Sequence, residues 1–220
     1  MTRLAVVFQS ERGHTAKLAH ALVQGANSVP GVQCQAHALR WDHVIQGRFV
    51  NSELFAALDQ SDGIVFGCAT YMGSGSALFK AFLEAAFKPW WLEQRWKDKV
   101  AAGFTNSASQ SGDKFSTLLQ LAVFAMQMGM IWVGVSDLPG NNWSGGSPTD
   151  LNRLGSWLGA MGQSNADEDT PSVGDIDTAH SFGARVATIT RRLKDGVAYE
   201  TERLSEAQFR ENNVKRSTLL

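Results

Sequence analysis

Short apolar runs alternate with amphipathic stretches along most of the chain. Residues 4–8 form a continuous apolar run, residues 9–13 are polar, and apolar side chains recur at helical spacing between residues 15 and 26. This order of strand, loop and helix repeats, so the pattern predicts five strands and five helices. The predicted strands are residues 4–8, 32–39, 64–68, 100–104 and 130–135. The predicted helices are residues 15–26, 54–58, 78–83, 118–127 and 175–194.

One long uncharged stretch has two explanations. No charged residue occurs between Lys114 and Asp137, and this distance is enough to cross a bilayer. The first half has apolar side chains at helical spacing, whereas residues 130–133, which follow Gly129, are typical of a strand. A helix that packs on a sheet and leads into an inner strand needs fewer assumptions than a lone membrane anchor. We therefore expect no membrane span.

Alternating strands and helices of these lengths predict an α/β fold. Right-handed crossovers between parallel strands give a doubly wound five-stranded parallel sheet with helices on both faces. Residues 1–195 form one domain in this prediction, and residues 196–220 form a polar C-terminal tail. Ligands of such sheets bind at the carboxyl ends of the strands, so the loops after the first, third and fourth strands become the candidate site.

Composition agrees with a single globular domain and excludes some partners. The 220 residues are 44% hydrophobic and carry a net charge of −1, so no overall field attracts nucleic acid or an anionic membrane. Cys34 and Cys68 lie on separate segments without the spacing of a metal or redox motif, and the histidines form no ligand set. The amino terminus lacks the features of a secretion signal. We expect a cytoplasmic protein without a metal site.

The loop after the first predicted strand has the composition of a phosphate site. It consists of Ser10, Glu11, Arg12, Gly13, His14 and Thr15. The helix that follows offers free N–H groups and the positive end of its dipole, and the hydroxyl groups and Arg12 add donors. The loop matches neither the dinucleotide-binding glycine motif nor the P-loop. An ordinary helix cap without a ligand explains the same residues.

Two further loops suit a flat, polar ring. The loop after the third strand contains Ala69, Thr70, Tyr71, Met72 and Gly73, followed by small residues to Ser76. The loop after the fourth strand contains Thr105, Asn106, Ser107, Ala108, Ser109, Gln110, Ser111 and Gly112. The first combines an aromatic ring and a thioether with small residues, and the second is polar without charge, which suits hydrogen bonds to a heterocycle.

Several motifs together resemble a known family. These are Ser10-x-x-Gly13-His14-Thr15, Thr70-Tyr71-Met72-Gly73, Phe104-Thr105-Asn106-Ser107, Gly129-Met130 and Gly145-Gly146-Ser147-Pro148. Over roughly residues 3–192 the chain is similar to the flavodoxin-like NAD(P)H:quinone oxidoreductases related to the tryptophan-repressor-binding protein. The resemblance implies a flavodoxin-like fold, FMN as cofactor, NADH or NADPH as co-substrate, a quinone-like acceptor, two-electron transfer and a homotetramer.

The resemblance also implies a role for particular positions. Residues 10–15 hold the FMN phosphate, residues 70–73 and 106–111 line the isoalloxazine, and Arg12 lies where the nicotinamide approaches. Trp90 stands over the substrate. Because hydride transfer to a flavin needs no side-chain acid or base, we name no catalytic residue.

The chain departs from the family at three places. Met128 replaces a histidine that precedes the Gly-Met pair and that we count with the cofactor site, Ala69 replaces a proline, and the segment 141–169 differs in length and content. Met128 can pack on a ring but cannot donate a hydrogen bond. Alternatives therefore remain open: an NAD(P)H-dependent FMN reductase, or a flavodoxin-like flavin-binding or scaffold protein without efficient turnover. An electron carrier is less favoured because such carriers are markedly acidic.

Aromatic residues cluster between Phe87 and Trp96. Trp90, Trp91 and Trp96 form a surface that is costly to leave in water on a monomer. A neighbouring subunit near the flavin can cover it, which predicts a homo-oligomer with a shared site. Alternatively, the tryptophans fold back onto their own chain beneath the long loop after Asp137, which predicts a monomer that still binds flavin.

Overall fold

The computed structural model describes residues 1–196; the predicted polar tail, apart from Gly196, lies outside the described residues. The strands are β1 (Thr2–Phe8), β2 (Val32–Ala38), β3 (Val44–Ile45), β4 (Arg48–Phe49), β5 (Gly63–Tyr71), β6 (Ser74–Gly75), β7 (Val100–Ser107), β8 (Ile131–Trp132) and β9 (Ala160–Gln163). The α-helices are α1 (His14–Asn27), α2 (Ser52–Asp59), α3 (Ala77–Ala85), α4 (Lys114–Gln127) and α5 (Val173–Asp195). Short helical turns occupy Trp41–His43 and Phe87–Trp91.

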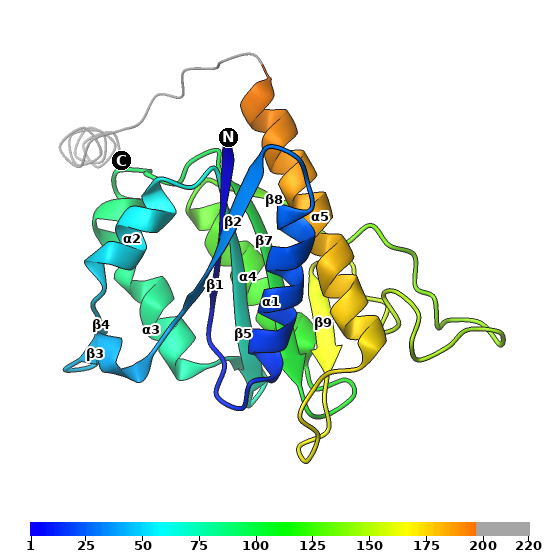
Figure 1. The fold of residues 1–220 in the computed structure, drawn as a ribbon. Helices are drawn as coiled ribbons and strands as arrows, with labels where there is room; N and C mark the ends of the chain where they lie inside the picture. Colours follow the sequence, from blue (N-terminus) through cyan, green and yellow to red (C-terminus); the bar gives the residue numbers. More distant parts are fainter. Residues whose placement is uncertain (197–220) are drawn as a thin grey trace, which may run out of the picture.

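The central sheet has the order β2-β1-β5-β7-β8, and every one of these pairings is parallel (Figure 1). The order reverses direction beside β1, because β2 lies on one side of β1 and all later strands lie on the other. The prediction of a doubly wound, five-stranded parallel sheet is confirmed.

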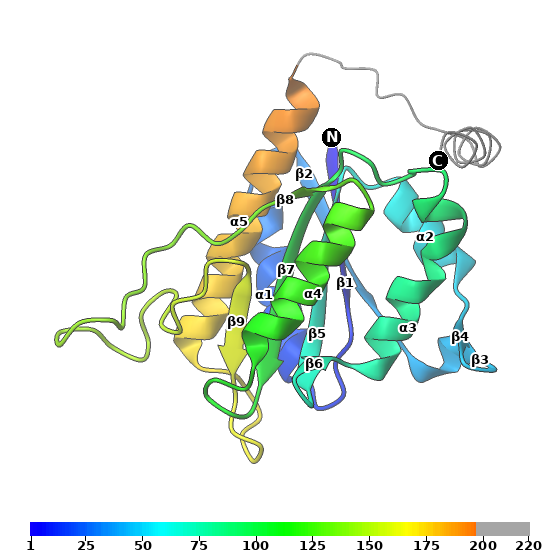
Figure 2. The same ribbon diagram turned by 180° about the vertical axis from the view of Figure 1, so that it is seen from behind.

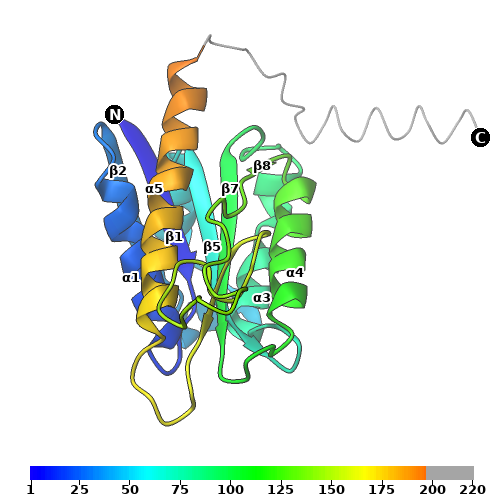
Figure 3. The same cartoon turned by 90° about the vertical axis from the view of Figure 1, so that its right-hand side faces the viewer.

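Helices cover both faces of this sheet. α1 and α5 pack on one face, and α2, α3 and α4 pack on the other (Figure 3). Side chains of β1 alternate between two apolar cores, with Leu4 and Val6 facing α1 and α5, and Ala5 and Val7 facing the opposite helices. Burial on both faces explains why β1 appears in the sequence as a continuous apolar run.

The fifth position of the sheet is shared by two segments. β8 pairs with the start of β7, where Val100 lies opposite Ile131, and β9 pairs with its end, where Phe104 lies opposite Ala160. Between them the chain makes a long excursion away from the sheet (Figure 2). The predicted strand at residues 130–135 is therefore shorter than expected, and β9 was not predicted because residues 160–163 contain no apolar run.

The uncharged segment after Lys114 forms α4 and β8, as predicted. Within residues 1–196, no helix is long and apolar enough to cross a membrane. The β3–β4 hairpin between β2 and α2 is an addition that the sequence pattern did not predict.

Candidate functional site

The three loops singled out by the sequence meet at one edge of the sheet. β1, β5 and β7 are neighbours in the order of strands, so their carboxyl ends lie side by side. Their loops enclose a pocket of about 160 Å³. It is lined by Ser10, Glu11, Arg12, His14, Thr15, Ala69, Thr70, Tyr71, Asn106, Ser107, Ala108 and Ala166. Eleven of these positions belong to the predicted loops, and Ala166 comes from the segment after β9.

The first loop turns into α1 through Gly13, whose φ of 88° lies in the left-handed region that favours glycine. Among residues 1–196, no side chain caps α1, so the ordinary side-chain cap considered for this loop is not present. The first N–H groups of the helix are therefore left for another acceptor. The hydroxyl oxygen of Ser10 is buried without a hydrogen-bond partner in the described chain, and so is Oε1 of Gln9. Unpartnered buried polar atoms are uncommon, and here they adjoin a helix start.

The segment after β9 is tied to the start of α1. The His14 Nε2 lies 2.5 Å from the carbonyl oxygen of Glu168, and the Lys17 ammonium donates to the carbonyl of Asp169. These contacts bring Ala166 to the pocket. His14 thus links the first loop to the segment after β9 at the pocket wall.

The second loop has a fixed base and an exposed tip. The Thr70 hydroxyl lies 2.8 Å from the hydroxyls of both Thr105 and Thr117, and Thr105 donates to the carbonyl of Cys68 at 2.7 Å. Tyr71 lines the pocket, and partial burial raises the pKa of its phenol, with the nearby Glu11 adding to the rise. Met72 and Gly73 form the tip with positive φ angles; Met72 is fully exposed and does not line the pocket.

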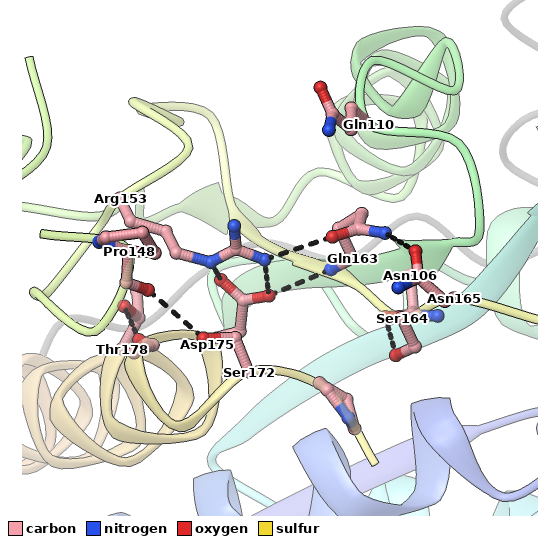
Figure 4. A network of polar contacts seen from close by, with 12 residues as sticks. Asn106, Gln110, Pro148, Arg153, Gln163, Ser164, Asn165, Ser172, Asp175 and Thr178 are labelled. Atoms are coloured by element: carbon pink, nitrogen blue, oxygen red, sulfur yellow. Dashed lines mark hydrogen bonds and ion pairs between the residues drawn. The ribbon is translucent and has the colours of Figure 1, made fainter. Parts of the chain in front are cut away.

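The third loop is connected to β9 and α5 by a network of polar contacts (Figure 4). Arg153 donates to both carboxylate oxygens of Asp175, at 2.8 and 2.7 Å, and Asp175 also accepts the backbone N–H of Gln163. The Gln163 side chain then donates to the carbonyl of Ala108 at 2.9 Å. The Asn106 side-chain amide lies 3.2 Å from the hydroxyl of Ser164, the residue that directly follows β9. The excursion between β8 and β9 is thereby linked to the pocket.

Lys114 lies beneath the third loop and was not predicted as part of the site. Its side chain is buried, and its ammonium donates to the Ser107 hydroxyl and to the carbonyls of Ser109 and Gln110, at 3.0, 3.2 and 2.7 Å. Burial lowers its pKa to about 8, although Asp175 acts in the opposite direction. The sequence gives no signal for this burial, because a lysine at a helix start beside a polar loop normally points into solvent.

The rest of the predicted third loop lies outside the pocket but close to it. Ser109 is exposed, and Gln110 and Ser111 line a neighbouring hollow together with Gly73. Ser116 of α4 donates to the carbonyl of Gly73, which ties the second loop to the start of that helix.

Two predicted site residues lie elsewhere in the chain. Met128 is buried and directly follows α4, whose 14 residues place it about 20 Å from the third loop. Figure 2 shows α4 running from the loops toward the opposite edge of the sheet. Trp90 follows α3 and stacks on Phe55 of α2, with 3.8 Å between ring centroids. One chain therefore brings neither residue to the pocket.

The tryptophan segment folds largely onto its own chain. Trp96 is fully buried and donates to Asp59 at 2.8 Å, and Trp90 packs against the core. Trp91 stacks with Phe87, which is exposed. Trp90 and Trp96 thus fold back onto their own chain, but they pack against α2 and not beneath the long loop after Asp137.

An open parallel sheet whose order reverses beside β1, with a helix start and two polar loops at its carboxyl edge, defines a flavodoxin-like protein. Residues 4–143 match the family model of NADPH-dependent FMN reductases. The chain belongs to this family.

Individual relatives carry different names. Flavodoxin FldP of Pseudomonas aeruginosa is 39% identical over 88% of this chain and 99% of its own length. An NAD(P)H dehydrogenase (quinone) of Acidithiobacillus ferrooxidans is 30% identical over 88% and 99%. A crystal structure described as the flavodoxin, WrbA-like protein from Agrobacterium tumefaciens superposes with a TM-score of 0.65 at 36% identity, covering 87% of this chain and 99% of that one.

Proposed function

We propose that the protein is an FMN-dependent oxidoreductase that transfers two electrons from NADH or NADPH to a quinone-like acceptor. The observation that carries this proposal is the uncapped start of α1 beside the buried, unpartnered hydroxyl of Ser10. These groups fit a phosphate monoester, which accepts hydrogen bonds from N–H and O–H donors. The family match and the quinone-reducing relatives supply the class of reaction.

The chain's own residues bind and orient in this proposal. Residues 10–15 hold the phosphate, Tyr71 and Ala108 border the isoalloxazine, and Arg12 provides a cation at the mouth for the nicotinamide co-substrate. When bound, FMN supplies the two-electron carrier, and hydride exchange with it needs no protein acid or base. We therefore assign no catalytic side chain.

We also propose that Met128 and Trp90 contribute to the FMN site only when subunits assemble into a homo-oligomer. The family resemblance suggests that this oligomer is a tetramer. A groove of about 840 Å³ between α3 and α4 is lined by Met128, Phe87 and Trp91, and by Leu119 and Val123, whose side chains are exposed. An apolar groove of this kind is suited to a second copy of the chain. The two buried free cysteines agree with a reducing compartment such as the cytoplasm.

Turnover of NADH and NADPH by the FMN-loaded protein, with and without benzoquinone, tests the proposal. Quinone-dependent oxidation of either nicotinamide supports it. Oxidation that requires an excess of free FMN instead of quinone indicates an FMN reductase. Absence of all nicotinamide oxidation refutes the enzymatic proposal.

A second candidate is an electron carrier. It is favoured by one observation, the 39% identity to a protein named flavodoxin. A carrier binds FMN and is reduced by dithionite or by a partner flavoprotein, but it does not oxidise NADH or NADPH directly. The turnover experiment therefore separates the two functions.

A further inference from the structure

Three successive carbonyl groups of the third loop are held from the inside of the protein. Gln163 donates to the carbonyl of Ala108 at 2.9 Å, and Lys114 donates to those of Ser109 and Gln110 at 3.2 and 2.7 Å. The side chains of residues 108–111 are nevertheless exposed. The loop thus lies on the surface while its carbonyl groups are fixed by two donors beneath it.

Both donors are themselves held in place. The three N–H bonds of the Lys114 ammonium face three acceptors, since the Ser107 hydroxyl accompanies the two carbonyls. The Gln163 side-chain oxygen lies 3.4 Å from the Arg153 guanidinium, and its backbone N–H donates to Asp175 at 2.9 Å (Figure 4). Lys114 cannot rotate away without breaking its bond to the buried Ser107 hydroxyl, and rotation of the Gln163 side chain breaks its contact with Arg153.

Fixing a carbonyl also fixes the N–H group of the next residue. In a planar trans peptide the two groups point in opposite directions. The N–H groups of Ser109, Gln110 and Ser111 therefore point away from Lys114 and Gln163, and none of them donates to an acceptor within residues 1–196. Successive outward N–H groups favour a negatively charged ligand.

We propose that Lys114 is a positioning residue that fixes the third loop at the edge of the pocket, which Ser107 and Ala108 line, and that through its own charge it favours the reduced form of bound FMN over the oxidised form. The inference rests on the proposed FMN site. Two-electron reduction leaves negative charge on the isoalloxazine when only one proton is taken up, and a cation that is fixed next to the site stabilises such charge. Oxidised FMN, whose ring is neutral, gains less from the same arrangement.

The test compares Lys114→Met, which keeps the volume but removes the charge and the donors, with the wild-type protein. The control is Lys194→Met, which removes an ammonium at the far end of α5, where Lys194 contacts Asp62 and the carbonyl of Met1. Apo-protein is titrated with oxidised FMN by flavin fluorescence, and the midpoint potential of the bound FMN is measured at pH 7. Circular dichroism verifies that each variant is folded.

In Lys114→Met, the affinity for reduced FMN divided by the affinity for oxidised FMN is expected to be at least tenfold lower than in the wild type. For a two-electron couple, this change lowers the midpoint potential by about 30 mV. Gln163→Leu removes one anchor without removing a charge, so it should weaken oxidised FMN binding while changing the potential less than Lys114→Met. Lys194→Met should match the wild type. Equal potentials in Lys114→Met and the wild type, with both loaded, overturn the inference and leave the proposed FMN site intact.

A second measurement needs only the wild-type protein. Arg153 and Asp175 are the charged groups that act on Lys114, and they form a mostly buried ion pair with each other. Loss of the Lys114 proton should therefore give an additional fall in the FMN potential as the pH rises through about 8. A potential without any added slope between pH 7 and 9 contradicts the role of the Lys114 charge. Failure of the wild type to bind FMN at all refutes the proposed function instead.

Discussion

Arg153 and Asp175 form a two-pronged ion pair that joins the excursion between β8 and β9 to the first turn of α5. The Arg153 Nε and Nη2 atoms lie 2.8 and 2.7 Å from the two carboxylate oxygens, and both side chains are mostly buried. Removing one member leaves the other charge buried without its partner. We expect Arg153→Ala to lower the free energy of unfolding by roughly 3–5 kcal/mol, measured by urea denaturation.

The control for this prediction is an exposed ion pair. Lys80 and Glu84 lie one helical turn apart on α3, and about half of each side chain is exposed. Lys80→Ala should change stability by no more than about 0.5 kcal/mol. A similar loss of unfolding free energy in the two variants would show that the contribution of the Arg153–Asp175 pair to stability does not depend on its burial.

Packing of α1 against α5 depends on Gly25. A Cβ atom at this position would overlap the carbonyl oxygen of His180 on α5, and backbone atoms cannot move aside as a flexible side chain can. Gly25→Ala should therefore destabilise the protein by about 1–3 kcal/mol or more, although alanine is the better helix former. Gln24→Ala, at an exposed neighbouring position, serves as the control in thermal unfolding and should have little effect.

Lys114 should make the stability of the apo-protein rise with pH above about 8. Its folded pKa of about 8 lies below the value of 10.5 for an unperturbed lysine, so the unfolded chain binds more protons between these two values. Stability increases with pH wherever the unfolded state binds more protons. The unfolding free energy of the wild type should thus gain roughly 1–3 kcal/mol over this window relative to Lys114→Met. Parallel curves for the two proteins would contradict the burial of a charged Lys114.

The order of elements was predictable because the central strands β1, β5 and β7 are buried on both faces and the helices have one apolar face. β9 was not predictable, since residues 160–163 gain their strand conformation only by pairing with the end of β7. The same limit applies to Trp90, because its place beside Phe55 depends on how the segment after α3 turns.

The sequence identified the pocket's loops but not the groups that hold them. Hydroxyls and glycine in residues 10–15 indicate a phosphate site by their chemistry alone. The side chains that support the loop at residues 107–110 lie far apart in the sequence or in segments without a motif. Only tertiary packing shows this role for Lys114, Gln163 and Arg153. Met128 shows the opposite error. The family resemblance predicts it at the cofactor site, but in a single chain the whole length of α4 lies between Met128 and that site.

A substitution at Ser10 tests ligand binding without changing the stability of the fold. Its buried hydroxyl has no partner in the described chain, so removing it should leave the stability of the apo-protein unchanged or slightly higher. The same change removes a hydrogen bond to a charged phosphate, which is worth about 1.5–3 kcal/mol. Ser10→Ala should therefore weaken FMN binding by roughly 10- to 150-fold without affecting the binding of riboflavin, which lacks the phosphate. Thr188→Val on α5 is the control, since within residues 1–196 the Thr188 hydroxyl donates only to the carbonyl of Ala184.

Titration of the purified apo-protein with FMN and with riboflavin, followed by flavin fluorescence, tests the central claim most directly. If the start of α1 and Ser10 form a phosphate site, FMN binds at micromolar concentration or below, and riboflavin binds far more weakly. Equal affinities for the two flavins, or no binding of FMN at micromolar concentration, would contradict the assignment of this pocket.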